Sequence, residues 1–221
     1  MTLRLLLIRH AETAIAMRGR CQGVLDVDLS PLGTRRARAL AEILRHEAID
    51  AVYASPLRRA KASAQPLAIA LDHELRIEDD LHEIDFGRCE GMTYAEIEVE
   101  FPEVYREWMA SPATVEFPEG ESFAVVQHRA WATMERLRAR HPEGTIAVYT
   151  HAGVLRAILG RVLAMPDHAV FRLNQNFGGV NILETSGGFT MLRAMNVRLD
   201  QRGGVVSTLR WYERLDDEEN E

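Results

Sequence analysis

Histidine and arginine side chains follow directly on several apolar runs of this sequence. Arg9 and His10 stand at the end of a run near the N-terminus. Arg58 and Arg59 come a few residues after a second run, and His151 follows a third. When apolar runs of this length form neighbouring parallel strands, their carboxyl ends lie at one edge of a sheet, where ligands of α/β proteins bind. We therefore expect these imidazoles and guanidiniums to meet around one site.

Such a set of groups is suited to a phosphate ester. A phosphomonoester carries about −1.5 to −2 charges near neutral pH, and one cation in contact with it contributes about 4 kcal/mol at a surface-like dielectric. Several donors are therefore needed, and the planar fork of arginine can bind two oxygens at once. Backbone N–H groups at the start of the helix expected after Gly153 would add to them.

Taken one at a time, these residues have ordinary interpretations. A single histidine after a strand is often structural, and Arg58 and Arg59 alone are typical of a solvated helix face. The 8 histidines and 33 acidic residues could also form a metal site. No two histidines, however, show the i, i+4 spacing of a zinc helix with its glutamate. The residues alone leave phosphate chemistry as one of several hypotheses.

The elements that would position these groups alternate between strands and helices, which predicts a mostly parallel sheet with helices on both faces. Residues 75–91 show no regular pattern. The predicted strands span residues 3–8, 51–54, 145–149, 180–184 and 189–194, and the predicted helices begin near Pro31 and Pro56 and span 94–110, 122–140 and 154–163.

Two helix starts carry the same signal. Ser30-Pro31 and Ser55-Pro56 each place a good N-cap residue before a proline suited to the first turn. The first of these helices would bury one side that includes Leu32. Pro66 is expected to bend or interrupt the second.

Length and charge narrow the classes of function. The 221 residues predict one domain, and the net charge of −7 argues against non-specific nucleic-acid binding. Cys21 and Cys89 do not form a secreted disulfide pattern, although a single bridge stays open. The N-terminal apolar run is too short for a signal peptide or a membrane span, so we expect a cytoplasmic protein without membrane contact. The acidic tail, residues 215–221, is expected to be mobile.

At this point the sequence resembles the histidine phosphatase superfamily, the group that includes cofactor-dependent phosphoglycerate mutase. The resemblance extends over nearly the whole chain, with its motifs in the family's order. The segments that carry it are Leu7–Thr13 with the first histidine, Arg20–Gly23, Asp28–Gly33, Ser55–Ala60 with the second arginine, Leu81–Gly91 with the acid/base, Pro118–Ser122, Tyr149–Arg156 with the second histidine, and Asn176–Asn181.

The resemblance implies a single domain over residues 1–221, a three-layer α/β/α sandwich with a mostly parallel central sheet and a small helical lid at about 84–122. It places the phosphate-binding arginine at Arg59, not Arg58. It implies that His10 is the nucleophile and Glu83 the general acid and base. The other residues that it implies are catalytic Arg9, Arg59 and His151, and the substrate contacts Arg9, Thr13, Gln22, Gly23, Arg59, His151 and Ala152, with no metal ligand among them.

The sequence departs from the family pattern at three positions. Ala16 stands where members often carry Asn, so one phosphate contact is expected to be missing or supplied elsewhere. Ala11 replaces a common Gly, and Ser63 replaces a frequent Thr while keeping the hydroxyl.

The implied activity is that of a histidine acid phosphatase-type phosphoric monoester hydrolase acting on small phosphorylated substrates through a phosphohistidine, with neither cofactor nor metal. A phosphoglycerate mutase is the first alternative, and a catalytically weak phospho-ligand binding protein is the second. Thr13 and Phe86–Arg88 favour the phosphatase, because mutases tend to carry Ser and a His-Tyr-Gly run there. The natural substrate stays open between α-ribazole phosphate, phosphoglycerate, sugar phosphates and a broad range, as does a homodimer through sheet edges.

Overall fold

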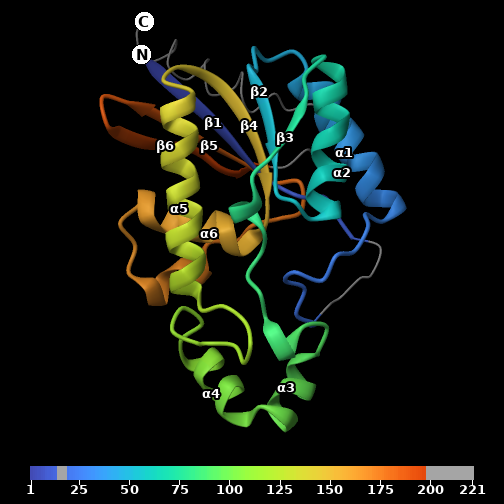
Figure 1. The fold of residues 1–221 in the computed structure, drawn as a ribbon, viewed down its shortest axis with the longest axis vertical. Helices are drawn as coiled ribbons and strands as arrows, with labels where there is room; N and C mark the ends of the chain where they lie inside the picture. The colour runs from blue at the N-terminus through green and yellow to red at the C-terminus, as the bar shows by residue number, and fades with distance from the viewer. Residues whose placement is uncertain (14–18, 198–221) are drawn as a thin grey trace, which may run out of the picture.

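The computed structural model describes residues 1–13 and 19–197. Its described part is built on a six-stranded sheet with strand order β3-β2-β4-β1-β5-β6 (Figure 1). β1, β2, β3 and β4 pair in parallel, while β5 and β6 are antiparallel additions. The predicted mostly parallel sheet is therefore confirmed. The strands are β1 Thr2–Arg9, β2 Ala51–Ala54, β3 Leu75–Ile77, β4 Gly144–Thr150, β5 Val180–Ser186 and β6 Phe189–Val197.

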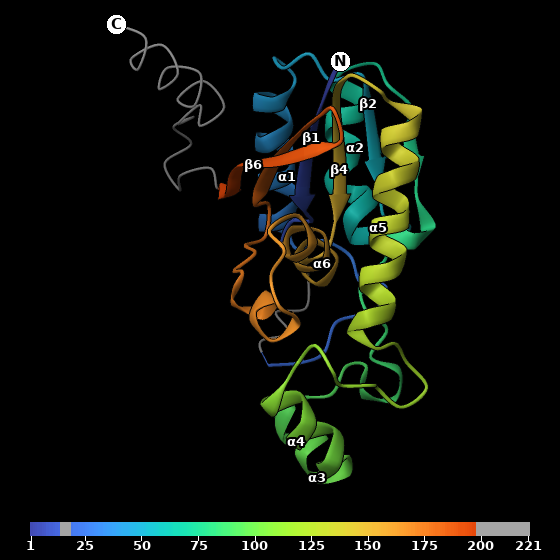
Figure 2. The ribbon, with the colours of Figure 1, turned by 90° about the vertical axis from the view of Figure 1, so that its left-hand side faces the viewer.

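Helices cover both faces of this sheet. α1 and α5 lie on opposite sides of β1 and β4 in Figure 2. α1 packs with α2, and α5 packs with α6. The three layers predicted by the sequence are thus present. The helices are α1 Pro31–Leu44, α2 Arg58–Ala70, α3 Tyr94–Glu100, α4 Pro102–Ala110, α5 Phe123–Arg140 and α6 Ala152–Val162, with short 3₁₀ turns at Asp79–Leu81, Gly87–Cys89 and Asp167–Arg172.

The central strand β1 contributes side chains to both hydrophobic cores, one on each face of the sheet. Leu5 and Leu7 pack into the cluster beneath α5 and α6, whereas Leu6 and Ile8 pack into the cluster beneath α1 and α2. All four are fully buried. Successive side chains of a strand point to opposite faces, so an unbroken apolar run is what a strand covered on both sides requires.

The predictions at the helix starts are only half confirmed. Ser30 caps α1, its hydroxyl accepting from the Gly33 N–H at 2.9 Å. Ser55 does not cap α2, which begins at Arg58 after Leu57. Leu32 is 42% exposed and does not belong to the buried side of α1. Pro66 does not interrupt α2, which continues to Ala70.

Two other predictions need correction. The helix expected over residues 94–110 is two helices, because Pro102 lacks the N–H that a continuing helix would use and disfavours α geometry at Phe101, whose φ is −130°. The segment expected to be irregular contains the short edge strand β3. Its three residues carry too little alternation to be recognised from the sequence.

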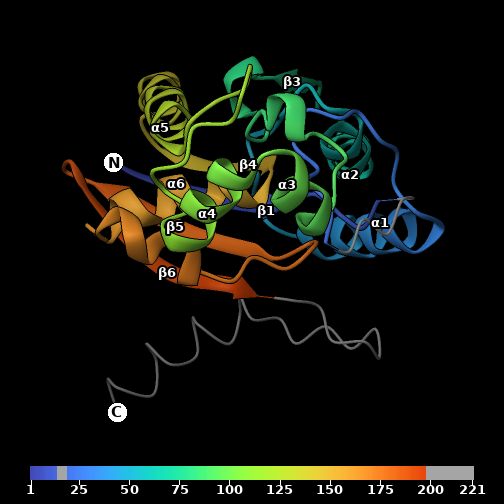
Figure 3. The same ribbon diagram turned by 90° about the horizontal axis from the view of Figure 1, so that it is seen from below.

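α3 and α4 protrude from the body of the protein, beyond the edge at which β1, β2 and β4 end (Figures 1 and 2). Seen from below, α3 and α4 lie in front of the sheet (Figure 3). They belong to the segment 84–122, whose aromatic side chains pack together and are continuous with the core beneath α5 and α6. The rings of Phe86 and Phe117 lie 4.8 Å apart, and Trp108 contacts both at 5.1 to 5.6 Å. Trp108 is buried by this packing.

Two predictions concern residues that the structure does not describe. Ala16 and the acidic tail lie outside the described residues. Within residues 1–13 and 19–197, no helix is long and apolar enough to cross a bilayer. Cys21 and Cys89 are both buried free thiols.

Candidate active site

The imidazoles of His10 and His151 lie side by side, with ring centroids 5.0 Å apart and planes tilted by 56°. The strand register places them there. Arg9 of β1 pairs with Thr150 of β4, and the His10 N–H donates to the Thr150 carbonyl at 2.9 Å. Each histidine is thus the residue that follows a paired strand end, as the sequence predicts. Both are buried.

His10 is held in one orientation by its own loop. Its Nδ1 lies 2.8 Å from the Ala11 carbonyl oxygen. Because a carbonyl can only accept, Nδ1 carries the proton and Nε2 keeps the free lone pair. The pKa of His10 is lowered well below 6.5, first by burial and then by the charges of Arg9 and Arg59. His10 is therefore a neutral imidazole near pH 7.

His151 is the N-cap residue of α6, and its ring contacts Ser55. The distance from His151 Nε2 to Ser55 Oγ is 2.7 Å, and both residues are fully buried. Burial lowers the pKa of His151 well below its usual value, and Arg59 and His10 add to the effect. Ser55, expected to cap a helix, instead orients the second histidine.

Arg59 reaches the site from the first turn of α2. Its guanidinium donates to the carbonyls of Leu25 at 2.8 Å and Gly23 at 2.5 Å, and the residue is fully buried. Burial lowers its pKa. Arg58, its neighbour, is exposed and forms ion pairs with Asp26 and Asp28. The structure thus separates the two arginines by burial.

Arg9 is fixed by the chain that precedes β5. It donates to the Gln175 carbonyl at 2.6 Å, and its guanidinium carbon lies 3.9 Å from the centre of the Phe177 ring. Burial lowers the pKa of Arg9 to about 10, while Glu83 opposes the shift. The Phe177 ring also packs 5.4 Å from His10. Phe177 therefore holds the first cation beside the candidate nucleophile.

The buried carboxylate of Glu83 lies at the N-terminus of α6. Both of its oxygens accept from the Gly153 N–H at 3.1 Å, and Oε1 also accepts from the Ile84 N–H at 3.0 Å. A Cβ at position 153 would lie 2.3 Å from Glu83 Oε1. Glycine at this position therefore permits the close approach of the carboxylate to the helix that carries His151.

The remaining predicted contacts lie around this centre. Thr13 Oγ1 donates to Gln22 Oε1 at 3.3 Å, and both hydroxyl and amide stand on the chain that follows β1. Gly23 supplies the carbonyl that holds Arg59. Ala152 is buried in the first turn of α6, next to His151. Ser63, which stands where the family frequently has Thr, accepts from the Ala11 N–H at 2.9 Å through its hydroxyl.

Sequence reasoning missed Glu90, Phe177 and Arg129 as contributors to the site. Glu90 accepts from the backbone N–H groups of Gly23 at 3.2 Å and Val24 at 2.9 Å. The loop that holds Arg59 is therefore tied to the segment 84–122. Glu90 and Phe177 each lie inside a segment that carries the family resemblance, and that position is their only signal in the sequence. The burial of Arg129 in α5 has no signal in the sequence.

A comparison with protein families agrees with this geometry. The family model described as histidine phosphatase superfamily (branch 1) matches residues 5–198. The chain belongs to this superfamily. The two histidines, Arg59 and Glu83 all lie within the matched range.

Relatives of this histidine phosphatase include phosphoserine phosphatases. Phosphoserine phosphatase 1 of Hydrogenobacter thermophilus is 40% identical over 162 residues, 73% of this chain and 77% of that protein. A metal-independent phosphoserine phosphatase of Arabidopsis thaliana is 37% identical over 72% of this chain and 68% of its own. These relatives support a phosphatase function.

Solved structures show the same fold. The crystal structure of a putative α-ribazole-5'-P phosphatase from Escherichia coli superposes with a TM-score of 0.82 at 28% identity. The match covers 89% of this chain and 97% of that one. The α/β fold expected from the sequence is therefore confirmed.

Proposed function

We propose that this histidine phosphatase hydrolyses small phosphate monoesters through a phosphohistidine formed at Nε2 of His10. One observation carries the proposal. The Ala11 carbonyl fixes the proton on Nδ1, 2.8 Å away, and leaves a neutral, unprotonated Nε2 between buried cationic groups. A neutral imidazole with its second nitrogen already bonded is a competent nucleophile at neutral pH.

The buried guanidiniums of Arg9 and Arg59 would bind the phosphate oxygens. Both have lowered pKa values because they are removed from water. A dianion placed between them would replace the solvation that they have lost and stabilise the charge that spreads in the transition state. His151 would donate to a further oxygen, and the first turn of α6 at Ala152 would supply a backbone N–H.

Glu83 would act as general acid and then as general base. In the first step the His10 Nε2–P bond forms, the ester P–O bond breaks, and the departing oxygen takes a proton from the Glu83 carboxyl. In the second step Glu83 takes a proton from water, the water oxygen bonds to phosphorus, and phosphate leaves neutral His10. No net proton is gained or lost by the protein over the cycle.

The segment 84–122 would act as a lid, and Thr13, Gln22 and Gly23 would contact the substrate at the rim. The contact of Glu90 with the Gly23 loop supports this assignment, since it joins the segment to the arginine-binding loop. The expected acid-phosphatase character is supported by the lowered pKa of His10, which keeps the nucleophile neutral below pH 6.5.

The substrate that we propose is a small phosphorylated hydroxy or amino acid, with L-phosphoserine as the first candidate. The relatives named above support it, and so does Arg156. This half-buried arginine of α6 donates only Nε within the described structure, to the Leu173 carbonyl at 3.0 Å. Its pKa is lowered by burial and raised by Glu83. A cation beside the group that serves the departing oxygen would attract a carboxylate on the alcohol.

A comparison of two alkyl phosphates tests this substrate class. Phosphoethanolamine resembles phosphoserine but lacks the carboxylate. We expect the wild-type protein to prefer phosphoserine in kcat/KM, and Arg156→Met to lose about 10- to 100-fold of that preference. An unchanged preference for phosphoserine in Arg156→Met would show that Arg156 does not bind the substrate carboxylate.

Trapping the intermediate tests the reaction itself. The wild-type protein, mixed with an aryl phosphate in excess chelator and quenched in alkali, should carry one acid-labile phosphoryl group, and His10→Ala should carry none. Turnover equal to that of His10→Ala would favour the binding protein. Isomerisation of phosphoglycerate without hydrolysis, on addition of 2,3-bisphosphoglycerate, would favour the mutase.

A further inference from the structure

Glu83 stands in a stretch of chain without regular secondary structure. Residues 82–86 lie between the turn Asp79–Leu81 and the turn Gly87–Cys89. The backbone groups of this stretch cannot bond within a helix or a sheet, so they need other partners when buried. The position of the Glu83 carboxylate depends on what these partners are.

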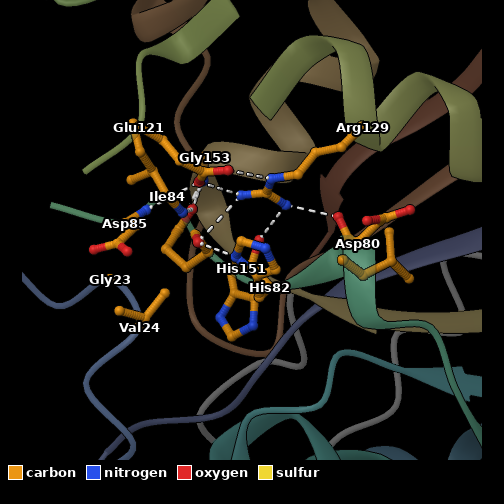
Figure 4. Close-up of polar contacts among 12 residues, drawn as sticks. Gly23, Val24, Asp80, His82, Ile84, Asp85, Glu121, Arg129, His151 and Gly153 are labelled. Atoms are coloured by element: carbon orange, nitrogen blue, oxygen red, sulfur yellow. Dashed lines mark hydrogen bonds and ion pairs between the residues drawn. The ribbon is translucent and has the colours of Figure 1, made fainter. Parts of the chain in front are cut away.

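A single arginine of α5 binds three carbonyls in this stretch and just before it. Arg129 donates Nη1 to the carbonyls of Asp80 at 2.6 Å and His82 at 2.7 Å, and Nη2 to the carbonyl of Glu83 at 3.2 Å (Figure 4). Three carbonyls within four residues, including that of Glu83 itself, thus converge on one guanidinium.

The rest of the guanidinium is bound by a carboxylate. Arg129 Nε donates to Glu121 Oε1 at 2.9 Å, and Nη2 donates to Glu121 Oε2 at 2.8 Å. Glu121 Oε2 also accepts from the Asp85 N–H at 3.1 Å. All five N–H groups of Arg129 are therefore used. Only 8% of the residue is exposed.

Together, Arg129 and Glu121 hold the backbone on both sides of Glu83, while the Gly153 N–H holds its side chain. We propose that Arg129 is a positioning residue, which with Glu121 fixes Glu83 for proton transfer to the leaving oxygen. This inference rests on the acid role proposed above for Glu83. Lysine could not reproduce it, because an ammonium has three donors and no planar fork.

The test exploits the leaving group. An aryl phosphate that releases an acidic phenol needs little protonation, whereas phosphoserine releases an alkoxide and depends on the acid. The quantity measured is kcat/KM, which covers only the steps up to loss of the leaving group. We expect Arg129→Lys to lower kcat/KM for phosphoserine by about 10²-fold or more, and for the aryl phosphate by less than about tenfold.

Arg136 provides the matched control. It lies further along α5, is exposed, and binds the side chains of Asp80 and Thr133 at 2.7 and 2.8 Å. In the part of the chain that the structure describes, it forms no hydrogen bond with the carbonyls around Glu83. Arg136→Lys should leave kcat/KM nearly unchanged for both substrates. Glu121→Gln, which turns one of the two acceptor oxygens into a donor and removes the charge that binds Arg129, should share the bias of Arg129→Lys. If Arg129→Lys does not fold, Glu121→Gln decides the matter.

Glu83→Gln separates the two proposals. If Glu83→Gln lowers kcat/KM equally for both substrates, Glu83 is not the acid and the proposed mechanism fails. Suppose instead that Glu83→Gln lowers kcat/KM for phosphoserine selectively. The positioning role is then overturned if folded Arg129→Lys lowers kcat/KM for both substrates equally, or for neither. Glu121→Gln is read in the same way if Arg129→Lys does not fold.

Discussion

The rings of His10 and His151 lie 5.0 Å apart because each residue follows directly on the paired strand ends Arg9 and Thr150. Parallel pairing brings residues that are distant in the chain to one edge of the sheet, and the backbone bond from His10 to Thr150 fixes their offset. The site therefore depends on strand register, which the two apolar cores around β1 maintain.

The lowered pKa of His10 predicts activity on the acid side of neutrality. An ordinary imidazole would be half protonated at pH 6.5 and would lose half of its nucleophilic form. We expect kcat/KM for an aryl phosphate, whose own second ionisation lies below that of alkyl phosphates, to stay constant as the pH falls through 6.5. An acid limb centred at 6.5 or above would contradict this prediction.

The same shifts predict how the free energy of unfolding depends on pH. The unfolded chain takes up protons on His10 and His151 below about pH 6.5, while the folded protein does not. Folded stability from these groups is therefore complete above pH 6.5 and is lost as the pH falls toward their lowered values. Denaturant unfolding from pH 7.5 to 5 should show this loss in wild type and a smaller loss in His10→Asn. The same substitution at exposed His46 should leave the slope unchanged, and equal slopes for all three proteins would contradict the assignment.

Arg59 and Arg58 offer a direct comparison of neighbouring cations. Arg59 is buried beside the histidines, whereas Arg58 is exposed and paired with Asp26 and Asp28. Arg59→Met should lower kcat by about 10²- to 10³-fold, as loss of one preorganised donor does elsewhere. Arg58→Met should cost less than about threefold, because an exposed ion pair contributes little. Comparable losses would mean that burial does not distinguish their roles.

Glu90 is expected to act on catalysis through Arg59. Its carboxylate accepts from Gly23 and Val24, and the Gly23 carbonyl holds the Arg59 guanidinium. Glu90→Gln turns one acceptor into a donor, so the loop should shift and kcat/KM should fall by about 10- to 100-fold.

Two measurements check this effect. Steady-state kinetics with inorganic phosphate as inhibitor should show weaker phosphate binding in Glu90→Gln. A thermal melt should show destabilisation by about 1–3 kcal/mol, since partly buried N–H groups lose one of the two acceptor oxygens. Glu98→Gln on the exposed face of α3 serves as the control. If the control loses as much activity, a general charge effect explains the result.

Much of the site could be read from the sequence because its residues stand at positions with local signals. His10, Arg59 and His151 follow apolar runs that form strands, and that edge of a parallel sheet binds ligands. The α/β class followed from the alternation of strands and helices. The prediction that Ser55 caps a helix is wrong, although Ser-Pro is a helix-start signal. The Ser55 hydroxyl binds the buried His151 ring instead.

The sequence by itself determined which residue types stand at the strand ends, the order of the elements and the family pattern. Only the tertiary structure decided which nitrogen of His10 lacks a proton and which arginines are buried away from solvent. It also decided how Arg129 and Glu121 bind the backbone around Glu83. The physical reason is range. Helix and strand patterns arise from neighbours a few residues apart, whereas Arg129 and Glu83 are 46 residues apart and meet only when the sheet and α5 have packed.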